Sequence, residues 1–265
     1  MREMHILFIG DIVGKSGRQS LRRALPILVE QHAIDIVVAN VENAAGGLGI
    51  TREVAEAIRD MGVDVMTSGN HIWDKKEALN YINLEPRLIR PANYPDAPGS
   101  GHYVARTSGG VTLGVINLMG RVFMNPLDNP FQVVRRELEH VRDQATVILV
   151  DFHAEATSEK VAMGWYLDGD VTAVVGTHTH VQTADERVLP NGTAYITDVG
   201  MTGPHDSVIG VETRPVLARF VNGMPSRFET ASANPRLNGV IITADPTTGR
   251  ARSIERVSVA AAALS

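Results

Sequence analysis

Short apolar runs rich in β-branched residues alternate along the chain with segments of helical periodicity. Runs such as IDIVVANV and ATVILV lack polar alternation, which is typical of strands that are buried on both faces. The alternation predicts βαβ units and a largely parallel or mixed sheet covered by helices. The expected strands are 5–10, 34–41, 63–68, 111–118, 146–152, 171–176 and 193–198, and the expected helices are about 16–31, 51–61, 74–83, 130–143 and 157–167.

Hairpin signals interrupt this alternation and continue toward the end of the chain. Residues 101–118 predict two strands around a Ser-Gly-Gly turn, and the segment 190–192 (PNG) predicts a second hairpin. Between about 214 and 258, the segments RPVLARFV, NGVIITAD and ARSIERVSV predict further short strands. An α/β fold built as a two-sheet α/β sandwich accommodates both the parallel front and the hairpin-rich back. The sequence contains no internal repeat or linker, so we predict a single domain over residues 1–265.

Composition narrows the class of protein. The chain has 265 residues, of which 44% are hydrophobic and 21% charged, enough for one well-packed core. It contains no cysteine, which excludes disulfides, zinc fingers, iron–sulfur clusters and thiol catalysis. A cysteine-free chain fits a reducing compartment, so we expect a cytoplasmic location. No run reaches the ~18 apolar residues that span a bilayer, and Asp11 interrupts the N-terminal run, so we expect a first strand and no membrane association.

Net charge limits the partners that we expect. The formal charge of −5 offers no broad attraction for nucleic acid, so we expect no stable DNA binding. A phosphate substrate would need a local positive partner, for which metal ions are the obvious candidate. The segment 10–16 (GDIVGKS) looks like a phosphate-binding P-loop, but its glycines lie too close together for that motif. The short C-terminal strands could serve a homo-oligomer interface.

Side chains that can bind metals follow five of the expected strands. In an α/β sheet, ligands bind in the crevice beyond the carboxyl ends of the strands. Five successive strand ends therefore each deliver such a side chain to one edge of the sheet. These residues are Asp11, Glu42, Asn43, Asn70, His71, His153, His178 and His180.

Each of these signals has a structural alternative when it is taken alone. Asp11 could cap a helix, and Glu42-Asn43 could form a turn with no chemistry. The segment 69–71 (GNH) is more specific, because glycine allows a tight turn on which two side chains converge. The segment 176–180 (GTHTH) is more specific again. Its two histidines at i and i+2 point the same way in extended backbone, so both could ligate adjacent metals.

The mixture of ligand types indicates the kind of metal. Leaving His71 aside, the set contains three imidazoles, two carboxylates and two amide oxygens, which is too rich in nitrogen for calcium or magnesium. It suits manganese, iron or zinc. Seven groups are too many for one tetrahedral ion, whereas two ions sharing the carboxylate of Glu42 would use them well. Two divalent ions with Asp11, Glu42 and a bridging hydroxide would keep about one positive charge for a phosphodiester.

These motifs resemble, in their order along the chain, those of the calcineurin-like metallophosphoesterases. The family's usual motifs are Asp-x-His, Gly-Asp-x-x-Asp, Gly-Asn-His-Asp/Glu, a lone histidine and Gly-His-x-His. The corresponding segments here run from Asp11 to His180, and two of them depart from the family. Val13 stands in place of the first histidine, and Glu42-Asn43 replaces the aspartate motif. Asn43 is the candidate for the missing ligand.

The departures, together with the segments ENAAGG, GNHIWD, GTHTHVQTAD and DVGMTGP, resemble one bacterial branch of that family, the YmdB-like phosphodiesterases. This resemblance implies a 2′,3′-cyclic-nucleotide phosphodiesterase with two divalent or mixed-valence transition-metal ions, iron or manganese, with zinc as an alternative. It also implies the roles of the residues. One ion would be held by Asp11, Glu42, Asn43 and His180; the other by Glu42, Asn70, His153 and His178; and His71 matches the general acid.

The mechanism that the resemblance implies is in-line attack on phosphorus by a hydroxide bridging the two metals. His71 would then protonate the departing ribose oxygen. A nuclease or a phosphatase on the same site stays open as an alternative. So does a non-catalytic regulator that binds metal and nucleotide, although a pure binder has no need of a proton donor at His71.

Overall fold

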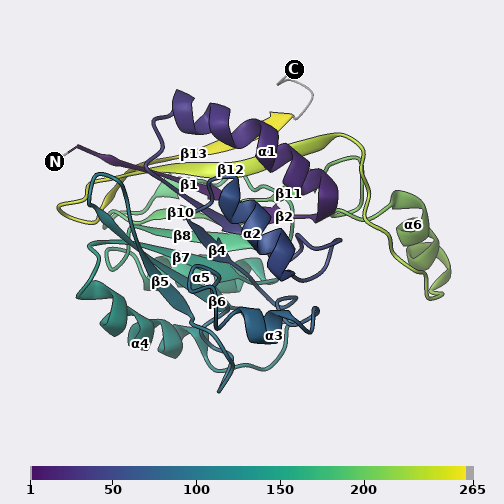
Figure 1. Cartoon of the computed structure of the whole chain (residues 1–265). Coiled ribbons are helices and arrows are strands. Elements are labelled where there is room, and N and C mark those ends of the chain that lie inside the picture. Colours follow the sequence, from purple (N-terminus) through teal and green to yellow (C-terminus); the bar gives the residue numbers. More distant parts are fainter. Residues whose placement is uncertain (1, 261–265) are drawn as a thin grey trace.

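The computed structural model describes residues 2–260. Figure 1 shows two sheets that lie against each other, with helices around them. The strands are β1 (Met4–Ile9), β2 (Asp11–Ile12), β3 (Ile36–Asn40), β4 (Val65–Thr67), β5 (His102–Arg106), β6 (Thr112–Met119), β7 (Val147–His153), β8 (Ala173–Thr177), β9 (Arg187–Val188), β10 (Ala194–Ile196), β11 (Met201–Pro204), β12 (Pro235–Ala244) and β13 (Ala251–Ala260). The helices are α1 (Gly14–Gln31), α2 (Arg52–Asp60), α3 (Ala78–Tyr81), α4 (Pro130–Arg142), α5 (Thr157–Tyr166) and α6 (Thr213–Asn222).

Both sheets are mixed. The first has the order β2-β11-β12-β1-β3-β4, with β13 paired to β12, and the second has the order β5-β6-β7-β8-β10-β9. In the first sheet β1, β3 and β4 run parallel, while β12 is antiparallel to β1. In the second, β6, β7, β8 and β10 run parallel, and the two predicted hairpins add β5 and β9 antiparallel at the edges. The predicted two-sheet α/β sandwich is confirmed.

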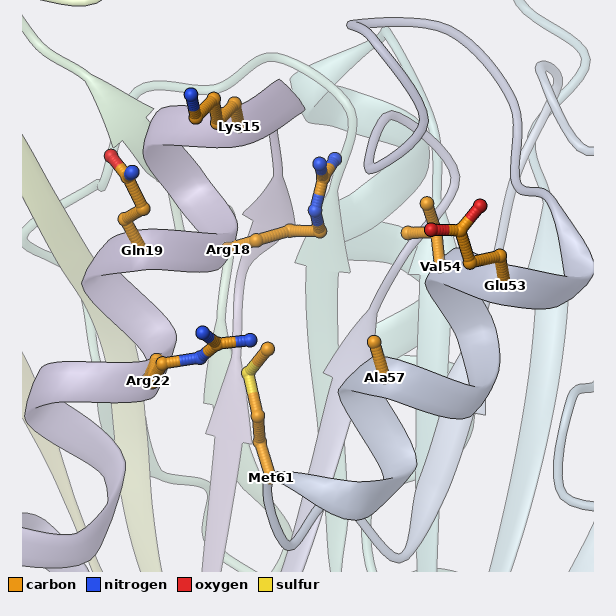
Figure 2. Close-up of a pocket in the computed structure, with 8 residues that line it drawn as sticks. All are labelled: Lys15, Arg18, Gln19, Arg22, Glu53, Val54, Ala57 and Met61. Atoms are coloured by element: carbon orange, nitrogen blue, oxygen red, sulfur yellow. The ribbon is translucent and has the colours of Figure 1, made fainter.

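Successive side chains of a strand point to opposite faces of its sheet, so the apolar residues of each strand are divided between two layers. On β1, Ile6 and Phe8 pack toward the second sheet, against residues such as Leu149, whereas Leu7 and Ile9 pack against α1 and α2. The helices α4 and α5 pack on the outer face of the second sheet. The result is four layers, helix–sheet–sheet–helix. Figure 2 shows α1 and α2 side by side over the first sheet.

The parallel strands of the two sheets end at a common edge. The Thr67 hydroxyl, at the end of β4, donates a hydrogen bond of 2.5 Å to the carboxylate of Asp151 near the end of β7. Asn40 is the last residue of β3, and its side-chain amide donates to the same carboxylate at 3.1 Å. The carboxyl ends of strands from both sheets therefore meet at one place, and side chains that follow them converge there.

Two expectations about the elements are wrong. The segment RPVLARFV, expected as a strand, forms α6, because its apolar side chains recur at the helical spacing of Val216, Leu217, Phe220 and Val221. Gly223 ends that helix in the left-handed region, at φ 71°. Figure 1 shows α6 standing apart from the two sheets. The helix expected over 74–83 is reduced to α3, with turns before it.

No helix in the described residues is both long and apolar enough to cross a membrane. The single-domain prediction for 1–265 stays a prediction, since residue 1 and residues 261–265 lie outside the described part.

The close approach of β8 to the end of β10 generates a stability prediction. A Cβ at Gly176 would collide with the backbone carbonyl of Thr197. Since backbone cannot swing aside as a side chain can, Gly176→Ala should lower the free energy of unfolding by about 1–3 kcal/mol. Gly109→Ala is the control, because its Cβ would meet only Thr107 Oγ1, at 3.8 Å. Urea unfolding compares the two variants, and equal midpoints would contradict the close contact.

Candidate metal centre

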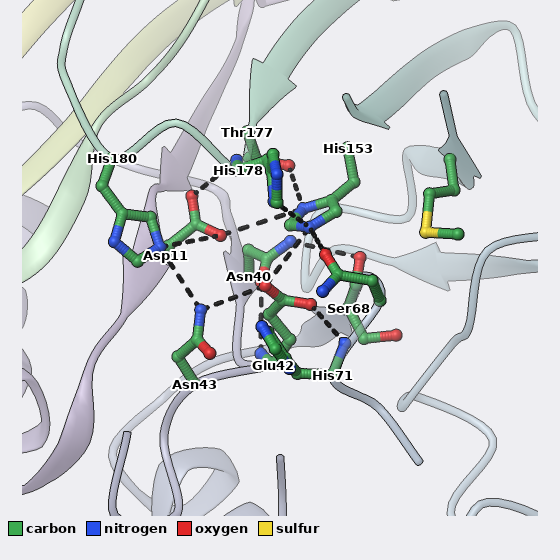
Figure 3. Close-up of polar contacts among 12 residues, drawn as sticks. Asp11, Asn40, Glu42, Asn43, Ser68, His71, His153, Thr177, His178 and His180 are labelled. Carbon is green, nitrogen blue, oxygen red and sulfur yellow. Dashed lines mark hydrogen bonds and ion pairs between the residues drawn. The ribbon is translucent and has the colours of Figure 1, made fainter. Parts of the chain in front are cut away.

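The side chains predicted at the strand ends lie together in the structure (Figure 3). The Nε2 atom of His153 lies 3.2 Å from Glu42 Oε1, 2.9 Å from Asn70 Oδ1 and 3.1 Å from His178 Nδ1. Glu42, His153 and His178 each offer one ligand atom, and these three atoms lie within 4.8 Å of one another. This is a compact group of donors around one point.

A second group lies around His180. The Asn43 amide lies 3.0 Å from Glu42 Oε1 and 3.3 Å from His180 Nε2. Asp11 Oδ1 lies 4.0 Å from the same imidazole nitrogen. Glu42 is therefore common to both groups. The structure brings together all seven predicted ligands, while their roles as ligands stay predictions.

The hydrogen-bond network assigns the proton of His153. The Thr177 hydroxyl donates its proton to Asp151, at 2.7 Å, so at its 3.0 Å contact with His153 Nδ1 it accepts. The Nε2 atom of His153, which carries the lone pair when the imidazole is neutral, faces the oxygens of Glu42 and Asn70. Electron-pair donors this close repel unless a cation or proton lies among them.

A buried oxygen of Asp11 also indicates that a cation or a proton is needed at this centre. Asp11 is fully buried, and its Oδ1 has no hydrogen-bond partner among the described residues. A buried carboxylate oxygen is costly unless it is paired or coordinates a metal. The donor set therefore fits positive ions, and its mixture of imidazole, carboxylate and amide suits first-row transition metals.

Burial and the charges of neighbouring groups shift the pKa values of the side chains in this pocket. Burial opposes ionisation of Glu42, yet the neighbouring His153 lowers the pKa of Glu42 to about 2. Burial likewise opposes protonation of His153, yet Glu42 and Asp11 raise its pKa to about 9. For His178, burial and the charge on His153 lower the pKa to about 3, which keeps this imidazole neutral and able to ligate. Burial raises the pKa of Asp11.

The GTHTH segment does not have the extended backbone that we expected. His178 and His180 have φ values of 99° and 65°, in the left-handed region that favours glycine. Asp198 explains this departure, because its Oδ2 accepts hydrogen bonds from both the backbone N–H and the hydroxyl of Thr179, at 3.1 and 2.7 Å. The loop is thus held between the two histidines by a buried carboxylate.

Outer contacts set which nitrogen of each histidine faces the centre. His178 Nε2 lies 3.1 Å from Glu155 Oε2, which leaves Nδ1 facing His153. His180 Nδ1 lies 2.8 Å from the carbonyl oxygen of Ile209, which leaves Nε2 facing inward. Such outer partners fix the ring orientation of metal-binding histidines.

His71 differs from the predicted ligands in exposure and in partners. Its side chain is partly exposed, and its Nδ1 lies 2.8 Å from Asp74 Oδ2. Its backbone N–H donates to Glu42 Oε2 at 3.0 Å, which fixes it beside the centre. It lines a cavity of about 190 Å³ together with Glu42, Asn43, Leu48, His178, His180, Ile209 and Thr230.

Sequence reasoning missed the residues that support these side chains. Asp151 has a visible signal, since it is a lone carboxylate in the apolar run of β7, two residues before His153. Asp74 lies within the GNHIWD segment, three residues after His71. Lys160 shows no signal, and Asp198 is visible only as the first residue of the DVGMTGP segment; nothing in the sequence pairs the two, because only the fold brings them together.

The buried pair of Lys160 and Asp198 generates a second stability prediction. Its atoms lie 2.7 Å apart, and both side chains are almost fully buried. Lys160→Met should lower the free energy of unfolding by about 3–5 kcal/mol, because the buried carboxylate of Asp198 loses its counter-charge. The exposed Lys76 provides the control, and Lys76→Met should change it by less than about 0.5 kcal/mol. Urea unfolding measures both variants, and equal stabilities would disprove a structural role for the pair.

Comparison with known sequences identifies the family of the chain. The sequence model of a family described as "YmdB-like protein" matches residues 7–257. Over 257 residues, the chain is 47% identical to the 2′,3′-cyclic-nucleotide 2′-phosphodiesterase of Bacillus subtilis (strain 168), an alignment that covers 97% of each chain.

Solved structures agree as well. The crystal structure of a phosphatase from Mycoplasma pneumoniae matches with a TM-score of 0.92 at 34% identity, covering 98% of this chain and 94% of that one. The calcineurin-like phosphoesterase YfkN from Bacillus subtilis, at 12% identity and a TM-score of 0.57, shares the fold over 98% of this chain and 91% of that one. The predicted resemblance is confirmed: the chain belongs to the YmdB-like protein family and has the calcineurin-like phosphoesterase fold.

Proposed function

We propose that this protein is a metal-dependent phosphoric diester hydrolase that acts on 2′,3′-cyclic nucleotides. The observation that carries the proposal is the pair of donor groups that share Glu42, with His71 at their exposed side. The name of the Bacillus subtilis relative, at 47% identity over almost the whole chain, supports this choice of substrate.

The cofactors in this proposal are two transition-metal ions, iron or manganese, with zinc as the alternative. Asp11, Asn43 and His180 would hold one ion, Asn70, His153 and His178 the other, and Glu42 both. When bound, the ions supply Lewis acidity toward the phosphoryl oxygens and a water acidic enough to act as nucleophile near neutral pH.

His71 acts as the proton donor to the leaving ribose oxygen. In the imidazolium form of His71, Asp74 accepts the Nδ1–H and the proton on Nε2 is the one transferred to the leaving oxygen. The Asp74 carboxylate also orients the ring, since its oxygen lies only 2.8 Å from Nδ1. The hydrogen bond from the His71 backbone to Glu42 ties the position of the acid to that of the centre.

The partner in this account is a small nucleotide, and we propose no stable binding of DNA. The cytoplasmic location and the homo-oligomer stay predictions.

Glu42→Gln tests the shared carboxylate. Loss of its charge should lower the content of both metals, and kcat/KM for 2′,3′-cyclic AMP should fall at least about 10²-fold. Metal analysis of the purified protein, paired with kinetics, measures both effects. Glu139→Gln, at an exposed position on α4, is the control and should behave as the parent protein. Full metal content and activity in Glu42→Gln would overturn the sharing of Glu42.

The same assay separates the rival functions. Cyclic nucleotides, oligonucleotides and aryl phosphates are compared side by side on the parent protein. A nuclease or a phosphatase would prefer the second or third substrate, and a non-catalytic regulator would bind nucleotide without turnover. Either result would replace the proposed activity.

His71→Ala tests the proton donor. We expect kcat for 2′,3′-cyclic AMP to fall by about 10²–10⁴-fold with metal content unchanged. Hydrolysis of bis(p-nitrophenyl) phosphate should fall much less, because nitrophenolate leaves without a proton. His140→Ala, at an exposed position on α4, is the matched control. Loss of metal, or equal losses on both substrates, would show that His71 is not the acid.

A further inference from the structure

A second cavity, of about 250 Å³, lies between α1 and α2 (Figure 2). Lys15, Arg18 and Arg22 line it, and their spacing of three and four residues places them on one face of α1. Gln19 and, from α2, Glu53 complete its polar lining. The cavity therefore has three positive side chains and one negative one, in a chain whose net charge is −5.

Of these cations, Lys15 and Arg22 are exposed and Arg18 is half-buried. Within residues 2–260, no carboxylate lies within ion-pair distance of Lys15, Arg18 or Arg22, whereas Arg52 and Arg59 of α2 each have such a partner. The Arg18 guanidinium is partly buried and donates to the carbonyl oxygen of Ala44. Burial lowers the pKa of Arg18, although the nearby Glu53 opposes this shift, so the site disfavours the positive charge of Arg18. An anion in the cavity would relieve this cost.

The cavity lies next to the segment that carries Asn43 of the candidate centre. Ala44, which Arg18 contacts, follows Asn43 of the candidate centre, and the Gly14 N–H donates to the Asn43 carbonyl oxygen at 2.9 Å. Val13 lines the cavity around His71, and Arg18 is five residues farther along the chain. The segment that contains Asn43 and Ala44 therefore borders both cavities.

The structure also shows where Lys15 of the segment GDIVGKS, which resembles a P-loop in sequence, is located. Lys15 follows the glycine pair of GDIVGKS but does not serve a phosphate cradle of that type. It lies in the first turn of α1 and is exposed at the rim of the cavity that it helps to line.

We propose that this cavity binds a second phosphate group of the substrate. The preferred substrates are then oligoribonucleotides that end in a 2′,3′-cyclic phosphate, with an internucleotide phosphate held by Lys15, Arg18 and Arg22. Arginine suits this role because its fork of N–H donors matches phosphate oxygens. This inference rests on the proposed function, since the cyclic phosphate must lie at the candidate centre.

Turnover of two substrates tests the inference. The value of kcat/KM is measured for 2′,3′-cyclic AMP and for the dinucleotide ApA with a 2′,3′-cyclic phosphate end. In the parent protein the dinucleotide should be preferred, and the preference should fall as salt rises. Arg22→Gln should reduce the preference by about tenfold, the effect of losing one charge-assisted hydrogen bond. Arg23→Gln, an exposed neighbour outside the cavity, should keep it.

A binding measurement keeps the result independent of catalysis. Fluorescence anisotropy with 5′-fluorescein-labelled hexaadenylate, which has no cyclic phosphate, should show weaker binding to Arg22→Gln than to Arg23→Gln. If the protein hydrolyses no cyclic phosphate but this difference appears, the proposed function fails and the phosphate site stands. Equal preference and equal binding in the two variants would overturn the site.

Free inorganic phosphate is the other ligand that would bring a phosphate group to this cavity. Inorganic phosphate is added during turnover of 2′,3′-cyclic AMP by the parent protein and by Arg22→Gln. If phosphate alters turnover only in the parent protein, and Arg22→Gln leaves the dinucleotide preference intact, the cavity binds a small effector. That result would overturn the assignment to the substrate.

Discussion

The rest of the site depends on the hydrogen bonds that the buried carboxylate of Asp151 accepts. It accepts hydrogen bonds from Asn40 and Thr67 of one sheet and from Thr177 of its own, so it joins the carboxyl ends of strands from both. Through the Thr177 hydroxyl it also sets the tautomer of His153. Complete burial raises the pKa of Asp151 to about 7, the cost of a charge held away from water.

Above this carboxylate, the fold gathers electron-pair donors that repel one another. Glu42, Asn70 and His153 direct electron-pair donor atoms at one point, and Asp11 has an oxygen without a hydrogen-bond partner in residues 2–260. Two residues with left-handed backbone, His178 and His180, lie in the same place. Bound cations would offset the repulsion, which is the physical reason for our proposal of a dimetal phosphodiesterase. Lys15, Arg18 and Arg22 of α1, which have no carboxylate partner within residues 2–260, complement the proposed dimetal centre, because they offer a nearby place for a second negative group.

Much of the fold and of the candidate site follows from local sequence. Strand ends were predictable because apolar runs stop at polar residues such as Asp11 and Glu42, and parallel strands bring their ends together. The segment 214–221 was misjudged as a strand, because its apolar run resembles one until the spacing of its larger side chains is considered. The GTHTH backbone could not be predicted, since Asp198, which shapes it, lies on another loop. Long-range pairs of this kind leave no pattern in a single sequence.

Anomalous diffraction from crystals of the protein grown with Mn²⁺ tests the central claim most directly. The account predicts two manganese peaks, both adjacent to the carboxylate of Glu42, one on the side of His153 and the other on the side of His180. A single peak, or two peaks of which one lies away from Glu42, would contradict it.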